Sequence, residues 1–287
     1  MRIAVAIVTR GRAGVLCAGL KRLEAQTRQP DQMILSATAP EDLRGAASTR
    51  LGANATLAFG EAGVAAQRNR ALKLARRADV IVFFDDDFTA FEDSLAGIEA
   101  LFAARPKLVA ATGHVVADGA RGAPLTEEMA VRAARTARRT TSERQVIGLY
   151  GCNMAIRMSA ARSMRFDEGL PLYGWQEDLD FGARLARRGE VIRTGAFGGA
   201  HLGVKGGRHP QRGLGYAQVA NPARLARGGC VPVWYLTRLA LGNIAANAAG
   251  AAIGDKWADR RGRLAGNLIA LADMARGRLD PERARVL

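Results

Sequence analysis

The sequence predicts an α/β fold with a mostly parallel, mixed sheet flanked by helices, followed by a helical, basic C-terminal extension. Short apolar runs alternate with segments of helical periodicity through the first half of the chain, which is the order expected of alternating strands and helices. One run, Asp79–Phe84, is apolar throughout after its first residue, as is typical of a strand buried on both faces of a parallel sheet.

The remaining elements follow from the same periodicities. We expect further strands at residues 3–9, 32–38, 55–59, 108–116, 146–150, 154–156 and 191–194, and helices at residues 61–77, 91–103 and 176–188. The arginine-rich stretch 118–145 is expected to be a partly helical insertion at the sheet edge, and residues 200–213 a loop rich in Gly and basic residues. A final amphipathic helix is expected to place one set of side chains on one face: Leu264, Leu268, Leu271 and Ala275.

The charge of the chain is concentrated at its C-terminal end. The net charge is +15, and residues 201–287 carry 14 basic but only 5 acidic side chains. Such a segment suits an anionic partner, namely a membrane surface, a phosphorylated lipid or a nucleic acid, although a solvated basic surface explains it equally well. No zinc spacing, RNA-binding aromatic pattern or helix-turn-helix pattern accompanies the charge, so we expect no nucleic acid partner.

Cysteine usage and apolar segments bear on localisation. Cys17, Cys152 and Cys230 are odd in number and far apart, which indicates neither a disulfide framework nor a metal site of closely spaced cysteines. The charged N-terminus is not typical of a signal peptide, and the uncharged run 239–253 is shorter than the ~20 residues of a membrane span. We therefore expect a cytoplasmic protein, with peripheral association at the inner face of the cytoplasmic membrane as a further hypothesis.

Three adjacent carboxylates, Asp85, Asp86 and Asp87, directly follow the buried strand. Ligands of open α/β sheets bind at the carboxyl ends of strands, and adjacent like charges repel one another unless a cation lies nearby. Because Mg²⁺ and Mn²⁺ prefer oxygen ligands, the cluster predicts a divalent metal site. The competing interpretation is a loop with helix-capping aspartates.

Glu177 and Asp178 lie in the first turn of a predicted helix. An aromatic and flexible stretch that includes Trp175 precedes them in the sequence. Acidic residues in a first turn are also favoured by the helix dipole alone, but the aromatic stretch is what a sugar-binding site needs. Arg68 near a helix start is suited to phosphate oxygens, and the glycine-flanked His201 to a metal or a pyrophosphate.

Together these segments resemble the family 2 glycosyltransferases of the GT-A fold. The matching pieces occur in the family's order over residues 3 to about 205: AIVTRGR, GVAAQRNRAL, VFFDDDF, GCNMAIR, WQEDLDFGARL and the late His201. The resemblance implies a GT-A core over residues 1–205, with a nucleotide-sugar-binding half (1–117) and an acceptor-side half (118–205), and an extension over residues 206–287.

The resemblance also implies roles for individual residues. Asp85 and Asp87 would form the DxD motif, with Asp87, Asp85 and His201 as candidate metal ligands for Mn²⁺ or Mg²⁺. Asp178 would be the general base, with Glu177 beside it. The nucleotide-sugar would contact one group of residues, and the sugar and acceptor another: Thr9, Arg10, Arg12, Ser36, Arg68, Asp85 and Asp86 for the first, and Gly151, Cys152, Asn153 and Trp175 for the second.

The resemblance implies an inverting hexosyltransferase of polysaccharide biosynthesis, acting from a nucleotide-diphosphate sugar on a glycan or lipid-linked acceptor. UDP is the first candidate nucleotide, although Ser36 or Thr38 stands where many family members have the acidic residue that reads the base. A sugar nucleotidyltransferase is the alternative, but TRGRAG lacks the lysine expected in its glycine-rich loop. A basic nucleic-acid-binding protein is a third, weaker alternative, and the oligomeric state is left open.

Overall fold

The computed structural model describes residues 1–138, 140, 142–171, 173–204 and 211–287. The chain forms two compact units, and each is described by itself. The first comprises Met1–Ala62, Ala66–Arg165 and Phe181–Gly207. The second comprises Gly63–Ala65, Phe166–Asp180 and Arg208–Leu287.

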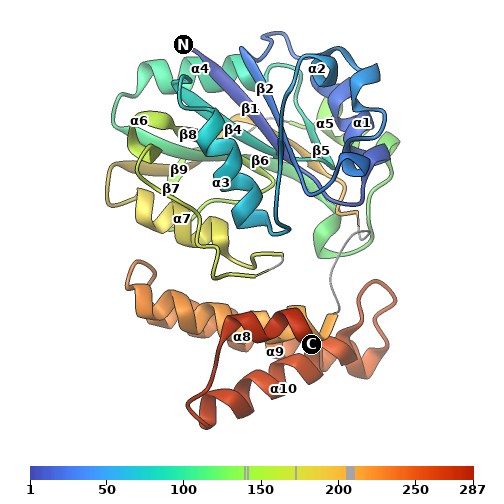
Figure 1. Cartoon of the computed structure of the whole chain (residues 1–287), viewed down its shortest axis with the longest axis vertical. Helices are drawn as coiled ribbons and strands as arrows, with labels where there is room; N and C mark the ends of the chain where they lie inside the picture. Colours follow the sequence, from blue (N-terminus) through green and yellow to red (C-terminus); the bar gives the residue numbers. More distant parts are fainter. Residues whose placement is uncertain (139, 141, 172, 205–210) are drawn as a thin grey trace. The chain divides into compact units, whose positions relative to one another are not determined.

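The first unit is built on a mixed sheet with the strand order β3-β2-β1-β4-β8-β6-β9-β5, and β7 pairs with β9 (Figure 1). The strands β1 (Ile3–Val8), β2 (Gln32–Ala37), β3 (Thr56–Phe59) and β4 (Val80–Asp85) are parallel neighbours. The strands β6 (Leu108–Asp118) and β9 (Glu190–His201) form a second parallel pair. The antiparallel strands are β8 (Asn153–Arg157) between β4 and β6, and β5 (Phe88–Ala90) and β7 (Arg144–Gln145) on β9.

Helices flank this sheet, and Figure 1 shows α3 crossing the face toward the viewer. The helices of this unit are α1 (Ala13–Leu23), α2 (Arg50–Ala53), α3 (Val64–Leu74), α4 (Ser94–Ala104), α5 (Glu127–Thr136), α6 (Met158–Ala161) and α7 (Glu177–Leu185), of which α3 and α7 have their first residues in the second unit.

Alternation along β1 builds the core between the sheet and two of these helices. Ile3, Val5 and Ile7 share one buried cluster with leucines of α1 and with apolar residues of α4, as the period of two in a strand requires. Helix α4 lies close to β9, because a Cβ atom on Gly97 would be only 2.1 Å from the carbonyl oxygen of Ala196. The predicted α/β class, with a mostly parallel sheet between helices, is confirmed.

Most predicted elements agree with the structure to within a few residues, but two predictions were wrong. Residues 146–150 do not form a strand, since after one backbone bond from Val146 to Val191 the chain turns toward Gly151. His201 ends a long strand instead of lying in a loop, because bulges let β9 continue alongside β6. Residues 205–210, which are half of the predicted loop after His201, lie outside the described residues, as does Arg139 of the arginine-rich stretch.

The second unit is helical, with α8 (Gln211–Gly228), α9 (Val233–Ile253), α10 (Arg260–Ala275) and a 3₁₀ helix, η4 (Pro281–Val286). Helices α8 and α10 approach backbone to backbone at glycines, since a Cβ on Gly215 would meet the carbonyl oxygen of Arg263 at 2.0 Å. The side-chain amide of Asn267 on α10 donates to the Gly215 carbonyl of α8 (2.6 Å), and that of Asn247 on α9 donates to Gln218 of α8 (2.7 Å).

This close approach explains why the predicted face of the last helix is not the buried one. The side chains of Leu268 and Leu271 are exposed, whereas α10 buries small and polar residues: Gly266, Asn267, Ala270 and Asp273. None of the described helices is long and apolar enough to cross a membrane.

Candidate functional site

The three adjacent aspartates lie at the end of β4 and take different partners. Asp85 is the last residue of β4 and is 27% exposed, whereas Asp86 and Asp87 are buried. Asp85 lies beside Arg68, Asp86 beside Arg12, and Asp87 accepts a hydrogen bond from the backbone N–H of Val204 (2.8 Å). The repulsion among three neighbouring carboxylates is thus balanced from several elements of the first unit.

Asp85, Asp87 and His201 form a cluster that can hold a metal ion. The Nε2 atom of His201 lies 3.3 Å from Asp87 Oδ1 and 3.8 Å from Asp85 Oδ2, and one ligand atom of each residue lies within 4.8 Å of the others. Two carboxylate oxygens and one imidazole nitrogen suit a divalent ion that accepts oxygen and nitrogen ligands. The predicted trio of metal ligands therefore lies together at the ends of β4 and β9.

The carboxylates and the imidazole of this cluster change one another's pKa values. Burial alone would lower the pKa of His201, but hydrogen bonds with Asp118 and Asp87 outweigh it and raise the pKa to about 10. Burial alone would raise the pKa of Asp87, but the contacts with His201 and Arg12 lower it to about 2. Without a metal ion the imidazolium of His201 therefore balances the carboxylates, and a metal bound at Nε2 must displace a proton.

Asp86 organises the loop after β1. It is fully buried, accepts a hydrogen bond from the hydroxyl of Thr9 (2.6 Å) and contacts the guanidinium of Arg12 (2.5 Å). Burial raises the pKa of Asp86 to about 7, with neighbouring Asp87 acting in the same direction and Arg12 against it. Three predicted nucleotide-site residues, Thr9, Arg12 and Asp86, are therefore joined, while Arg10 is exposed at the same loop.

Arg68 links the metal cluster to the start of β8. Its side chain is 3% exposed and donates to the Gly151 carbonyl (2.9 Å), with Asp85 Oδ1 3.4 Å away. Cys152 and Asn153 are buried, and the carbonyl of Cys152 accepts a hydrogen bond from the Asp85 backbone N–H (3.2 Å). The segment predicted to lie beside the sugar thus adjoins the aspartates through its backbone.

Two polar residues without a predicted role, Gln67 and Asp42, connect the ends of β1 and β2. The side chain of Gln67 donates to the carbonyls of Thr9 (2.8 Å) and Ser36 (2.9 Å). Asp42 accepts hydrogen bonds from Gly11 and from Thr38. Asp42 therefore fixes the loops after β1 and β2. The buried Ser36 lies in β2, and its carbonyl accepts the backbone N–H of Thr9 (3.0 Å).

The predicted catalytic acids lie in the second unit. Glu177 and Asp178 begin α7, and the chain before them takes left-handed backbone angles at Gly174 (φ 60°) and Gln176 (φ 73°). A left-handed Gln is unusual, and such strain clusters at functional sites. Trp175 packs against the helical core of this unit, and its carbonyl accepts a hydrogen bond from Asn221 (2.8 Å).

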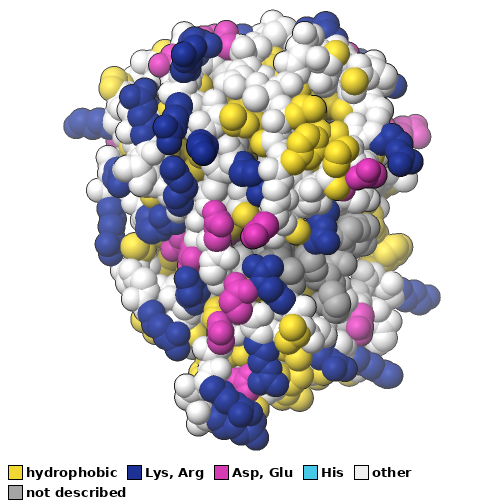
Figure 2. Space-filling model, in the orientation of Figure 1, with side chains coloured by type: hydrophobic (Ala, Val, Ile, Leu, Met, Phe, Trp, Pro, Cys, Tyr) yellow, Lys and Arg dark blue, Asp and Glu magenta, His cyan; other side chains and the backbone are white. Residues whose placement is uncertain are grey.

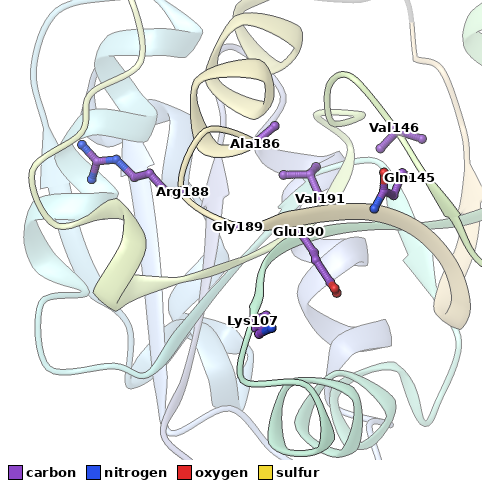
Figure 3. Close-up of a pocket in the computed structure, with 8 residues that line it drawn as sticks. All are labelled: Lys107, Gln145, Val146, Ala186, Arg188, Gly189, Glu190 and Val191. Atoms are coloured by element: carbon purple, nitrogen blue, oxygen red, sulfur yellow. The ribbon is translucent and has the colours of Figure 1, made fainter.

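A separate pocket of about 420 Å³ lies at the other end of β9 (Figure 3). It is lined by Lys107, Gln145, Val146, Ala186, Arg188, Gly189, Glu190 and Val191. Glu190 is the first residue of β9 and His201 the last, so this pocket is separated from the aspartate cluster by the length of the strand.

The mixed sheet and its flanking helices are like those of solved proteins of the GT-A fold. The model of the family described as glycosyl transferase family 2 matches residues 4–165, which is more than half of the chain, so the chain belongs to that family. The adjacent aspartates form a DxD-like motif, and the protein is a transferase.

Solved structures share this fold. One is the mannosyltransferase PcManGT from Pyrobaculum calidifontis in complex with GDP-Man and Mn²⁺ (TM-score 0.59, 20% identity, 99% of this chain and 85% of that chain). Another is S. aureus TarS 1–349 in complex with UDP-GlcNAc (TM-score 0.57, 13% identity, 84% of this chain and 70% of that chain). Among curated proteins, none matches this sequence.

The contacts of Asp42 predict a pH-dependent contribution to stability. Burial alone would raise its pKa, but hydrogen bonds from Thr38, Gly11 and Ala39 hold the pKa below 3.8, the usual value. We expect Asp42→Asn to lower the free energy of unfolding at pH 7 by about 1–3 kcal/mol, as measured by urea denaturation. Because the folded-state pKa is depressed, the difference from wild type should persist above pH 3.8 and shrink as the pH falls through the folded-state pKa. A difference that is constant from pH 7 to pH 3 would contradict this account.

Proposed function

We propose that the protein is an inverting glycosyltransferase that transfers a sugar from a nucleotide-diphosphate donor to a glycan or lipid-linked acceptor. The observation that carries the proposal is the convergence of Asp85, Asp87 and His201, with Arg68 and the loop of Thr9 and Arg12 beside them. A divalent ion, Mn²⁺ or Mg²⁺, would be held by the first three residues, and when bound it would offset the negative charge of the donor's diphosphate.

The other roles fall to side chains of this chain. Arg68 would orient the donor's phosphates, and Arg12 with Thr9 would shape the nucleotide pocket that Asp86 and Ser36 hold from behind, with Arg10 at its edge. Asp178, with Glu177 beside it, would take the proton from the acceptor hydroxyl as that oxygen attacks the sugar from the face opposite the leaving group. The anomeric configuration would be inverted by this attack.

The donor and acceptor are proposed from chemistry and from relatives. PcManGT was solved with GDP-Man and TarS with UDP-GlcNAc, so both nucleotides are candidates, and UDP is our first choice. Gly151, Cys152, Asn153 and Trp175 would adjoin the sugar and the acceptor. The pathway we propose is polysaccharide biosynthesis.

Donor binding and catalysis separate in two variants. We expect UDP or GDP to raise the thermal unfolding midpoint in the presence of Mn²⁺ but not in its absence. A ligand at 100 times its dissociation constant stabilises the folded state by about 2.7 kcal/mol. Asp87→Ala should abolish this shift, whereas Asp178→Asn should keep the shift but lower the rate of sugar transfer by roughly 10²–10⁴-fold.

The matched control for Asp87→Ala is Glu92→Ala, which removes an exposed carboxylate of the first unit. It should change neither the nucleotide shift nor the rate of sugar transfer. A nucleotide shift that survives Asp87→Ala would argue against the metal site. Release of pyrophosphate from a nucleoside triphosphate, without sugar transfer, would favour the alternative of a sugar nucleotidyltransferase.

We further propose that the second unit binds the anionic inner face of the cytoplasmic membrane. Helix α9 contains a single charged residue, Arg238, yet Trp234 is 63% and Ile253 is 82% exposed. Figure 2 shows hydrophobic and basic side chains on one face of this unit, with acidic side chains among them. Exposed apolar and basic groups on one helical unit suit an interface of lipid headgroups better than a second protein copy of like charge.

This proposal is tested by co-sedimentation with vesicles. We expect binding to vesicles that contain phosphatidylglycerol but weak binding to pure phosphatidylcholine, with a loss of affinity at high salt. Trp234→Ala should weaken binding severalfold because the exposed indole would no longer insert. Leu57→Ala, which truncates an exposed apolar side chain of the first unit, is the control. Equal binding by both variants, or no binding by wild type at low salt, would contradict the proposal.

A further inference from the structure

The register of β6 and β9 places Asp118 beside His201. The two strands run parallel, with Val115 opposite Gly199 and Ala117 opposite Ala200, so that β6 contains one extra residue, Val116. This bulge shifts all later pairs by one position and brings Asp118, instead of Ala117, opposite His201. Since a one-residue shift exchanges the two faces of a strand, the bulge determines which side chain meets the histidine.

Asp118 and a tyrosine hold the ring of His201 on the side away from the aspartate cluster. The Nδ1 atom of His201 lies 3.0 Å from Asp118 Oδ1, and the other oxygen of Asp118 accepts a hydrogen bond from the hydroxyl of Tyr150 (2.8 Å). The rings of Tyr150 and His201 meet edge to face, with centroids 6.3 Å apart. Asp118 is itself fixed, because its Oδ1 atom also accepts the backbone N–H of Ala120 (3.0 Å).

We propose that Asp118 and Tyr150 are positioning residues for the metal centre. Asp118 holds a proton on Nδ1 of His201 and so leaves Nε2 as the nitrogen that faces Asp85 and Asp87, while Tyr150 fixes both the carboxylate and the plane of the ring. Partners of this kind orient a ligating histidine and make it a stronger ligand. The inference rests on the proposed function, since it takes the metal site of that proposal as given.

Asp118 is assigned to this indirect role by its position. Its contact is with Nδ1, whereas the other two carboxylates lie near Nε2, on the opposite side of the same ring. Among the described residues the group that can share an ion is Asp85, Asp87 and His201, without Asp118.

The test is the affinity for Mn²⁺ alone, measured by electron paramagnetic resonance of the free ion, so that no donor or acceptor is needed. We expect Asp118→Ala to raise the dissociation constant by about 10–100-fold. Asp118→Asn keeps an acceptor for Nδ1–H but loses the charge, so it should raise the dissociation constant by less than Asp118→Ala does. Tyr150→Phe should also raise it by less than Asp118→Ala does. Thermal unfolding without metal identifies any variant that fails to fold. If Asp118→Ala fails to fold, the affinity of Asp118→Asn is the test.

A double-mutant cycle distinguishes positioning from a general effect of charge. If Asp118 acts through the histidine, Asp118→Ala should change the affinity by less than about twofold in a His201→Ala background. The reason is that the effects of two residues in direct contact are not additive. An effect of equal size in both backgrounds would overturn the proposal, as would wild-type affinity in Asp118→Ala. Loss of Mn²⁺ binding in Asp87→Ala but not in Asp118→Ala would overturn only this inference, whereas a wild-type protein that binds no Mn²⁺ would overturn the proposed metal centre as well.

Discussion

The packing of four carboxylates, Asp85–Asp87 and Asp118, around the ends of β4, β6 and β9 is the constraint on which the first unit depends. Like charges this close are tolerated only when each meets a positive group or a hydrogen-bond donor. Arg12, Arg68 and His201 supply the charges, and they come from the loop after β1, from α3 and from β9. Electrostatic balance therefore joins segments far apart in the sequence at the place where a metal ion can bind.

The same balance explains how structure and chemistry are linked. Asp86 contacts Thr9 and Arg12 and so supports the loop after β1, while Asp85 and Asp87 are directed at His201. One short segment thus serves two purposes, since its middle carboxylate supports the loop and its outer carboxylates form the metal cluster. The family assignment and the similar folds of solved glycosyltransferases agree with this arrangement.

The sequence predicts the strands around this site well and the distant contacts poorly. The buried run before Asp85 and the alternation of strands and helices are local patterns, so they identify β4 and the α/β class directly. Asp118, Tyr150 and Asp42 were not assigned to the site. A bulge in β6 positions Asp118, and Tyr150 and Asp42 lie in segments between strands, so no local periodicity indicates their contacts. The buried face of α10 was missed for a related reason, since close helix approach favours Gly266 over leucines.

In the proposed function, Asp85, Asp87 and His201 bind the catalytic metal ion. Anomalous X-ray scattering from a crystal grown with Mn²⁺ and UDP or GDP tests it most directly. We expect one strong peak at coordination distance, about 2 Å, from Asp85, Asp87 and Nε2 of His201. A manganese peak elsewhere, or nucleotide bound with no metal near His201, would contradict it.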